Sequence, residues 1–380
     1  MAFSTRSHNC FAQLGSISFF LSSITIVGLI FASGGAVFAQ TMPADEAIVR
    51  RLDSAIAAHV ANGFTGSVLI AHHGQVIVDK SYGVSVKADS HPIYWLASNS
   101  KPILALAIMK LQEQGRLSVD DRITKFFKNV PSDKKEITLT NLLTHTSGLP
   151  HMYVAEGVTD RNEAVDAVLK LSLQYKIGDG WHYANTNYYL LAAIVEIASG
   201  KTFEQYIRSS IFDPVGLRDT GFWGFEENRP ILPPLNLSRM NSLKPTIFKN
   251  GRSVANWGYR GATGLFSTTA DLYKLFTALR NEAILSRESI DQMWAPLVFI
   301  RHDPSSDVYS GLGWYISMRG GKRTAVRHTG SEDALGHNGV IWFYENGDAL
   351  VVLSNSGERN GSGMSAALSS DLSKVLTDLN

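Results

Sequence analysis

The sequence predicts an α+β fold in which an antiparallel sheet is built from both ends of the chain, is flanked by helices and receives a mainly helical insertion. Strand-like runs occur near both ends, helical periodicity dominates the middle, and tight-turn signals join neighbouring strand-like runs. Strands separated in this way can still pair in one sheet. We expect one domain over residues 44–375, with an α/β part at about 44–105 and 285–380 and a helical subdomain at about 106–284.

The composition is that of a globular protein that can bury a substantial core. The chain has 380 residues, of which 44% are hydrophobic and 18% charged. Lys and Arg number 35 and Asp and Glu number 34, so no single-sign field would attract nucleic acid or an anionic membrane. We therefore expect no nucleic-acid partner.

The N-terminal segment has the layout of a secretory signal peptide over residues 1–39. Arg6 and His8 precede the apolar run ISFFLSSITIVGLIFA, and small residues lead to Ala39, where we expect cleavage. The exported chain would be periplasmic or secreted. An uncleaved membrane anchor is the alternative, and membrane contact is expected only in that case. Cys10 precedes the apolar run, so the mature chain would have no thiol.

The first elements after the leader are expected to be a helix and a hairpin. Apolar residues recur at helical spacing over Ala44–His59, which indicates an amphipathic helix. The segment GSVLIAHHGQVIVDKSYG then places two β-branched runs around His73-Gly74-Gln75, a polar turn with a glycine. His72 and His73 are adjacent, so we expect them to point to opposite faces as exposed turn-flanking residues that do not share a metal ion.

The middle of the chain predicts three helices. Ile103–Met109 is nearly continuously apolar and Gly115 is a helix stop, which indicates a buried helix. Asn185–Ile197 is apolar at helical spacing and ends at Gly200, and Thr269–Leu279 forms a further helical stretch that begins near an aspartate. These helices would build the insertion.

The last third returns to strand patterns. We expect strands at Tyr309–Met318 and Arg323–His328, followed by the pair GVIWFY and DALVVLSN. Glu345-Asn346-Gly347 joins that pair and is a strong hairpin turn. A final helix is expected through Ala366–Leu379.

Ser98-Asn99-Ser100-Lys101 is the candidate for nucleophilic chemistry. It lies where a loop enters the buried helix, and residues three apart share a helix face, so the Lys101 amine can reach the Ser98 hydroxyl. A desolvated lysine can activate a serine, and the backbone N–H groups of a helix N-terminus stabilise an oxyanion. The spacing alone favours a helix cap beside a solvated lysine.

Three motifs in order resemble the class C β-lactamase family, which includes serine DD-carboxypeptidases and related esterases. The tetrad Ser98–Lys101 matches the first motif, Tyr183-Ala184-Asn185 the second, and His328-Thr329-Gly330 the third, where lysine is commoner than histidine. The resemblance implies a β-lactamase/transpeptidase-like fold. Further segments that resemble the family are LLTHTSGLP, GATGLFSTTADL and the terminal VVLSNSG.

The resemblance also implies roles for the matched residues. Ser98 would be the nucleophile, and Tyr183 would share proton transfer with Lys101, its phenol kept partly ionised by nearby cationic charge. Asn185 would donate to the substrate amide and help hold Lys101. A helix N-cap is the alternative interpretation of Asn185.

The third motif is expected to bind substrate. His328, Thr329 and Gly330 would line the site, and the backbone N–H of Ser331 would pair with that of Ser98 as an oxyanion hole. Imidazole titrates near ~6.5, so His328 would be largely neutral at pH 7, where a lysine would be charged. A substrate carboxylate would then be held less firmly, which puts efficient β-lactam hydrolysis in doubt.

The remaining histidines and glycines have structural interpretations. His145 lies in a segment that we interpret as structural, and His182 is expected to pack, with a pocket wall as the alternative. Gly66, Gly261 and Gly264 are expected to serve the backbone.

The expected function is that of a serine hydrolase that forms an acyl-enzyme on Ser98 with a small-molecule amide, lactam or ester substrate. β-Lactamase, DD-carboxypeptidase or penicillin-binding protein, D-aminopeptidase and esterase activities remain open, because they differ in pocket shape and water position. A protein that binds or senses β-lactams or peptidoglycan fragments without turnover is an alternative of another class. We expect no cofactor and no metal.

Overall fold

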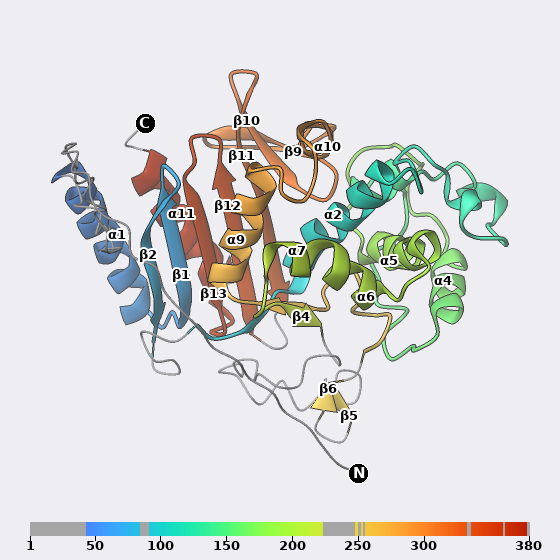
Figure 1. Cartoon of the computed structure of the whole chain (residues 1–380), viewed down its shortest axis with the longest axis horizontal. Helices are drawn as coiled ribbons and strands as arrows, with labels where there is room; N and C mark the ends of the chain where they lie inside the picture. Colours follow the sequence, from blue (N-terminus) through green and yellow to red (C-terminus); the bar gives the residue numbers. More distant parts are fainter. Residues whose placement is uncertain are drawn as a thin grey trace, which may run out of the picture. The chain divides into compact units, whose positions relative to one another are not determined.

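An eight-stranded antiparallel sheet is the centre of the computed structural model (Figure 1), with strand order β2-β1-β13-β12-β11-β10-β9-β8. The structure describes residues 43–83, 91–222, 248–249, 252–253, 255–332, 336–359 and 362–377, so the predicted leader at 1–39 lies outside it. The strands of the sheet are β1 (Gly66–His72), β2 (Gln75–Tyr82), β8 (Val298–Asp303), β9 (Ser306–Ser310), β10 (Tyr315–Arg319), β11 (Lys322–Glu332), β12 (His337–Tyr344) and β13 (Ala349–Ser354).

Pairing of β1 with β13 confirms that the two ends of the chain build one sheet. Val68 lies opposite Val352 in that ladder, which joins the first hairpin to the last. The expected single strand Tyr309–Met318 is wrong, because a bend that contains Gly313, with a φ of 78°, divides it into β9 and β10. The edge strand β8 was not expected from its pattern.

Side chains that alternate along the strands supply two separate layers of core. Val68, Ile70 and Val352 join the cluster beneath α1 (Pro43–Ala61) and α11 (Met364–Thr377). Leu69 and Val351 belong to the cluster on the other face, where α9 (Thr269–Arg280) lies over the sheet in Figure 1. The expected α+β architecture is therefore confirmed.

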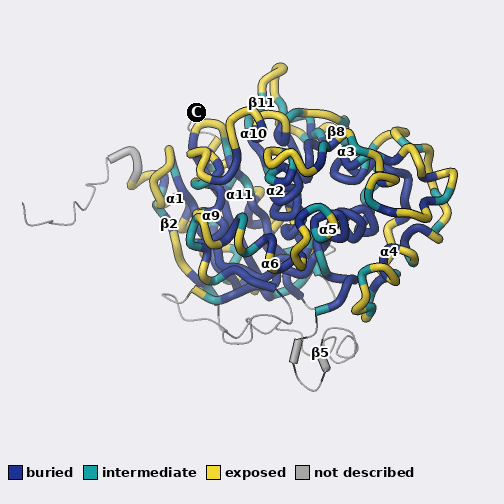
Figure 2. Tube along the Cα trace, turned by 45° about the vertical axis from the view of Figure 1, so that its right-hand side comes forward, coloured by how far each residue is buried: buried dark blue, intermediate teal, exposed yellow. Residues whose placement is uncertain are grey.

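Two buried helices connect the sheet to the helical part of the chain. Helix α2 (Ser100–Glu113) is buried from Ser100 to Met109, and α5 (Asn185–Ser199) is buried from Asn185 to Val195, as the dark tube in Figure 2 shows. Gly200 ends α5 with a left-handed φ of 71°, a conformation that glycine adopts without strain. Both helices agree with the sequence prediction.

The other described elements are short, except α4 and α9. Helices of five residues, such as α3, carry too few periodic positions to be recognised in a sequence. None of the described helices is both long and apolar enough for a membrane crossing. The elements are β3 (Tyr94–Trp95), α3 (Leu139–Leu143), α4 (Arg161–Leu169), α6 (Phe203–Ile207), α7 (Asp213–Val215), β4 (Gly221–Phe222), β5 (Phe248–Lys249), β6 (Arg252–Ser253), β7 (Leu265–Ser267), α9 (Thr269–Arg280), α10 (Arg287–Met293), β14 (Glu358–Arg359) and β15 (Ser362–Gly363), with 3₁₀ turns at Ala97–Asn99, Ile123–Lys125 and Ser132–Lys134 and a π-helical turn at Arg208–Phe212.

The expectation that His72 and His73 point to opposite faces is wrong. His72 is the last residue of β1, but His73 lies in the turn with a φ of 47°, where strand alternation no longer applies. Their ring centroids are 4.0 Å apart. The His72 side chain is also only 11% exposed, because it contacts Asp348.

Candidate active site

Ser98 lies in a 3₁₀ turn directly before α2. The preceding residue, Ala97, is buried and has a φ of 47°. A non-glycine residue in this region costs roughly 1–3 kcal/mol and persists only where its surroundings impose it. The N–H of Leu96 donates to the Leu265 carbonyl, which fixes the chain just before this turn. The nucleophile candidate is therefore held by a constrained backbone.

Lys101 is fully buried behind Ser98. Its Nζ lies 3.0 Å from Ser98 Oγ and donates to the Ala262 carbonyl at 2.9 Å. Burial lowers the pKa of Lys101 well below its usual 10.5, against a smaller opposing effect of the Glu332 carboxylate. A neutral amine with a free lone pair can accept the Ser98 proton, as the sequence predicts for a desolvated lysine.

Tyr183 completes a triangle of polar atoms. Its hydroxyl lies 2.7 Å from Ser98 Oγ. Burial raises the pKa of Tyr183 well above 10, so the expectation of a partly ionised phenol is wrong. Lys101 Nζ lies 4.9 Å from the centroid of the Tyr183 ring, but burial favours the neutral form of this amine. These pKa directions suit Tyr183 to donate or relay a proton and Lys101 to accept one.

Replacement of Tyr183 by phenylalanine tests this relay. We expect kcat/KM for ester substrates to fall by about 10²- to 10⁴-fold, the usual contribution of a positioned proton-transfer group. The ring contacts with His145 and Trp181 would remain, so the melting temperature should hold. Steady-state kinetics and thermal unfolding measure both quantities. An unchanged kcat/KM would exclude the relay.

Asn185 lies at the first position of α5 and is 1% exposed. Its backbone N–H donates to His151 Nδ1 at 3.2 Å, and its Oδ1 is buried without a hydrogen-bond partner. Asn185 and Lys101 both lie in the described part of the chain, and no hydrogen bond joins them. The expected support of Lys101 by Asn185 is therefore wrong, and the Ala262 carbonyl accepts from Lys101 instead. Ala184 is the N-cap, which removes the capping interpretation.

Two histidines near the second motif, His145 and His182, make packing contacts. His145 is buried, its ring centroid is 4.5 Å from that of Tyr183, and its Nδ1 accepts the Ala184 N–H at 3.1 Å. Burial lowers the pKa of His145 well below 6.5, so it is a neutral acceptor that positions the second motif. His182 stacks on Tyr175 with ring centroids 3.3 Å apart, as the packing interpretation expects.

The third motif lies within β11 and divides into buried and exposed residues. His328 is 2% exposed and stacks on Tyr315 at 4.8 Å, and its Nδ1 lies 2.8 Å from the Thr329 carbonyl. Burial lowers the pKa of His328 to about 3, with a smaller contribution from Lys101. His328 is therefore neutral, as expected. Thr329 and Ser331 are exposed on the same strand.

Gly330 allows β11 to pass against the turn that carries Ser98. A Cβ at this position would lie 2.2 Å from the Leu96 carbonyl oxygen, so only glycine fits without displacement. The close approach supports the predicted oxyanion hole of the Ser98 and Ser331 N–H groups, which stays a prediction. A Cβ at Gly66 would likewise collide with Leu353, and a Cβ at Gly261 would collide with Leu104. Both glycines therefore have the backbone roles that the sequence predicts.

Sequence reasoning missed four residues of this site, which are Ala262, His151, Tyr315 and Glu332. Ala262 contributes a backbone carbonyl, for which side-chain chemistry gives no signal. His151 and Tyr315 act through ring contacts with Tyr183 and His328. Glu332 follows the third motif by two residues, and its proximity to Lys101 depends on how β11 passes α2.

The chain is similar in sequence and in structure to several known proteins. "Putative penicillin-binding protein PbpX" of Bacillus subtilis is 27% identical over 303 residues, covering 78% of this chain and 72% of that protein. A "Putative D-alanyl-D-alanine carboxypeptidase" of Escherichia coli K12 is 26% identical, covering 81% and 82%. The octameric penicillin-binding protein homologue from Pyrococcus abyssi superposes with a TM-score of 0.71 at 28% identity, covering 87% of this chain and 77% of that one.

The family model named "Beta-lactamase" matches residues 52–372, which include all three motifs. A D-amino acid amidase from Ochrobactrum anthropi shares the fold with a TM-score of 0.70 at 24% identity, covering 88% of this chain and 98% of the amidase. The match spans most of the chain and includes the Ser98–Lys101–Tyr183 triangle. This protein is therefore a serine hydrolase that belongs to the Beta-lactamase family.

Proposed function

We propose that this hydrolase acts through an acyl-enzyme on Ser98 and prefers ester or amide substrates that carry no carboxylate. Ser98 Oγ attacks the carbonyl carbon while Lys101 Nζ accepts its proton, and the carbonyl oxygen becomes an oxyanion. Collapse of this intermediate expels an alcohol or amine, which takes up the proton through Tyr183. Water then attacks the acyl-enzyme by the reverse transfers and releases the acid.

The neutral, buried His328 is the observation that carries the substrate preference. A lysine in this position would offer a permanent cation for a substrate carboxylate, whereas His328 has a pKa of about 3 and stacks under Tyr315. Hydrogen bonds to charged groups contribute about 1.5–3 kcal/mol, so their loss weakens carboxylate recognition substantially.

Neighbouring charges support the same preference. Arg301 and Arg327 both form ion pairs with Asp303, at 2.7 and 2.5 Å, so neither is an unpaired cation. The Glu332 carboxylate acts on Lys101 and would repel an anionic substrate. Arg301 on β8 and Arg327 on β11 are therefore both neutralised by a carboxylate and do not replace a cation at position 328.

A D-alanyl-D-alanine carboxypeptidase is the second candidate, and the name of the E. coli relative favours it. Such a substrate ends in a carboxylate, so the same neutral His328 weighs against it. A binding protein without turnover would acylate at Ser98 and fail to release the product. Time-resolved mass spectrometry separates these cases, because only a turning-over enzyme loses its adduct.

A chemically matched pair of substrates tests the preference directly. We expect a β-lactam whose carboxyl group is methylated to acylate Ser98 at least as fast as the free acid. In His328→Lys the ratio should shift toward the free acid by about 10- to 100-fold, the equivalent of one charged hydrogen bond. Stopped-flow acylation rates for both compounds measure the ratio.

His302→Lys is the matched control, because His302 is an exposed histidine on β8. It should leave the ratio unchanged. The proposal is wrong if the wild-type enzyme already prefers the free acid by tenfold or more. That comparison needs no variant and holds even where His328→Lys disturbs the fold.

We also propose that the chain is exported and cleaved near Ala39, which the charged, apolar and small-residue order of residues 1–39 supports. A mature protein whose mass corresponds to a start at Gln40 is the expected result in a secreting bacterial host. Recovery of the full-length chain in the membrane fraction would contradict cleavage.

A further inference from the structure

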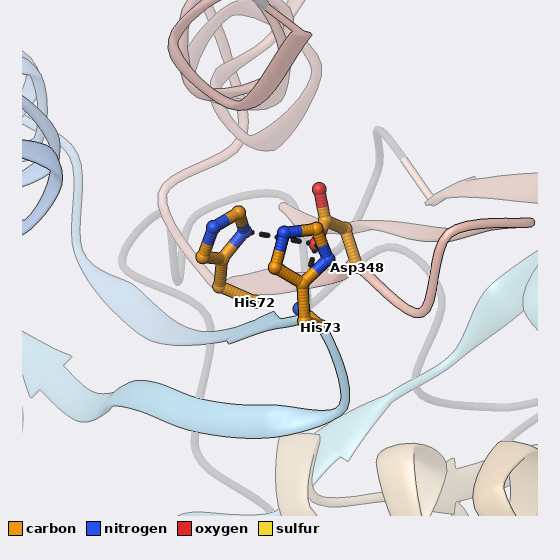
Figure 3. Close-up of side chains that lie close together, drawn as sticks. All are labelled: His72, His73 and Asp348. Carbon is orange, nitrogen blue, oxygen red and sulfur yellow. Dashed lines mark hydrogen bonds and ion pairs between the residues drawn. The ribbon is translucent and has the colours of Figure 1, made fainter. Parts of the chain in front are cut away.

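We propose that His72, His73 and Asp348 form a binding site for one divalent transition-metal ion such as Zn²⁺. None of these residues belongs to the Ser98 site. Their potential ligand atoms, two imidazole nitrogens and a carboxylate oxygen, all lie within 4.8 Å of one another. Figure 3 shows both rings beside the Asp348 carboxylate.

The distances between the ligand atoms suit a small ion. His72 Nδ1 lies 2.9 Å and His73 Nδ1 3.8 Å from the same oxygen, Asp348 Oδ1. Ligands held at 2.0–2.1 Å around a tetrahedral ion are about 3.3 Å apart, a value between these two distances. Side-chain adjustments of about 1 Å would therefore let the three ligand atoms share one ion, with coordination replacing the hydrogen bond between His72 Nδ1 and Asp348 Oδ1.

Two hairpin turns hold these ligands in place before any ion binds. The N–H of Gly74 donates to the Gly347 carbonyl at 3.0 Å, which joins the β1–β2 turn to the β12–β13 turn. The N–H of His73 donates to Asp348 Oδ1 at 2.8 Å, and Asn346 Nδ2 donates to Asp348 Oδ2 at 2.9 Å. A φ of 47° at His73 then directs its ring to the same side as that of His72.

The ligand set and its burial indicate the class of ion. Two imidazoles and one carboxylate suit Zn²⁺ and its neighbours better than Mg²⁺ or Ca²⁺, which prefer oxygen ligands. The side chain of Asp348 is 1% exposed and that of His72 11%, whereas that of His73 is 59% exposed. The site is thus buried on the side of Asp348 and open on the side of His73, where an ion and water can enter.

Zinc titration of the metal-stripped full chain tests the site. We expect isothermal calorimetry to show one Zn²⁺ per chain, no comparable binding of Mg²⁺, and a melting temperature that rises with Zn²⁺. His73→Asn removes the imidazole but tolerates the positive φ, and it should weaken Zn²⁺ binding by more than about 10-fold. Asp348→Asn should do the same.

His302→Ala is the matched control, because His302 is another exposed histidine beside a carboxylate, Asp307, at 2.6 Å, but without a second ring as a ligand. Its affinity for Zn²⁺ should equal that of the wild type, as should that of Cys10→Ser, which removes the leader thiol. Absence of saturable Zn²⁺ binding, or binding that His73→Asn leaves intact, would overturn the proposal and leave His72–Asp348 as a hydrogen-bonded clamp. Ester hydrolysis is expected to persist in His73→Asn, so this outcome is independent of the proposed function.

Discussion

Ser98→Ala is expected to abolish the covalent adduct and to reduce ester hydrolysis by about 10⁴-fold or more. Lys101 Nζ and the Tyr183 hydroxyl both lie within 3.0 Å of Ser98 Oγ, so all the proton-transfer groups converge on this one atom. Without Oγ no bond to the acyl carbon can form. Intact-mass spectrometry after incubation with a reactive ester or a penicillin measures the adduct directly.

Ser331→Ala is the control for this experiment, because Ser331 is predicted to act through its backbone N–H. It should retain the adduct and most of the hydrolysis rate. Labelling that persists in Ser98→Ala, or that is lost in Ser331→Ala, would contradict the assignment of Ser98 as the nucleophile.

Lys101→Ala is expected to slow acylation by about 10²- to 10⁴-fold and to remove the acidic limb of the pH–rate profile. Only the neutral amine accepts the Ser98 proton, so kcat/KM of the wild type should rise with pH as Lys101 deprotonates. Because burial lowers the pKa of Lys101 well below 10.5, this rise should occur at correspondingly lower pH than for an exposed lysine. Tyr183 has a pKa well above 10 and stays protonated over the same interval.

Acylation rates from roughly pH 5 to 10, in the wild type and in Lys101→Ala, measure the limb. Lys134→Ala provides the control, since Lys134 is also buried but pairs with Asp133. Its profile should match that of the wild type. An acidic limb that survives in Lys101→Ala would assign the titration to another group.

Patterns local to one element predicted most of the fold. The spacing of Ser98 and Lys101, the apolar run of α5 and the turn at Glu345-Asn346-Gly347 each depend on residues within a few positions of one another. The structure keeps those relations because hydrogen bonding and burial within one helix or hairpin enforce them. Pairing of β1 with β13 followed from the strands at both ends of the chain.

Features that depend on burial or on distant backbone could not be predicted. The expected ionised Tyr183 assumed nearby cationic charge, but burial disfavours both the phenolate and the charged form of the neighbouring Lys101. The Ala262 carbonyl that holds Lys101 is 161 positions away in the chain, and a carbonyl carries no residue signature. His73 departs from strand alternation because of its positive φ, which the sequence does not specify for a histidine.

The support of Lys101 by Ala262 also determines when in the life of the chain the site can exist. Lys101 is synthesised 161 residues before Ala262, the residue whose carbonyl holds its amine. Tyr183 comes between them, and β11 follows later still. A nascent chain that has emerged as far as α5 therefore contains Ser98, Lys101 and Tyr183 but lacks the carbonyl that holds Lys101. The site can therefore assemble only after Ala262 and β11 have been synthesised.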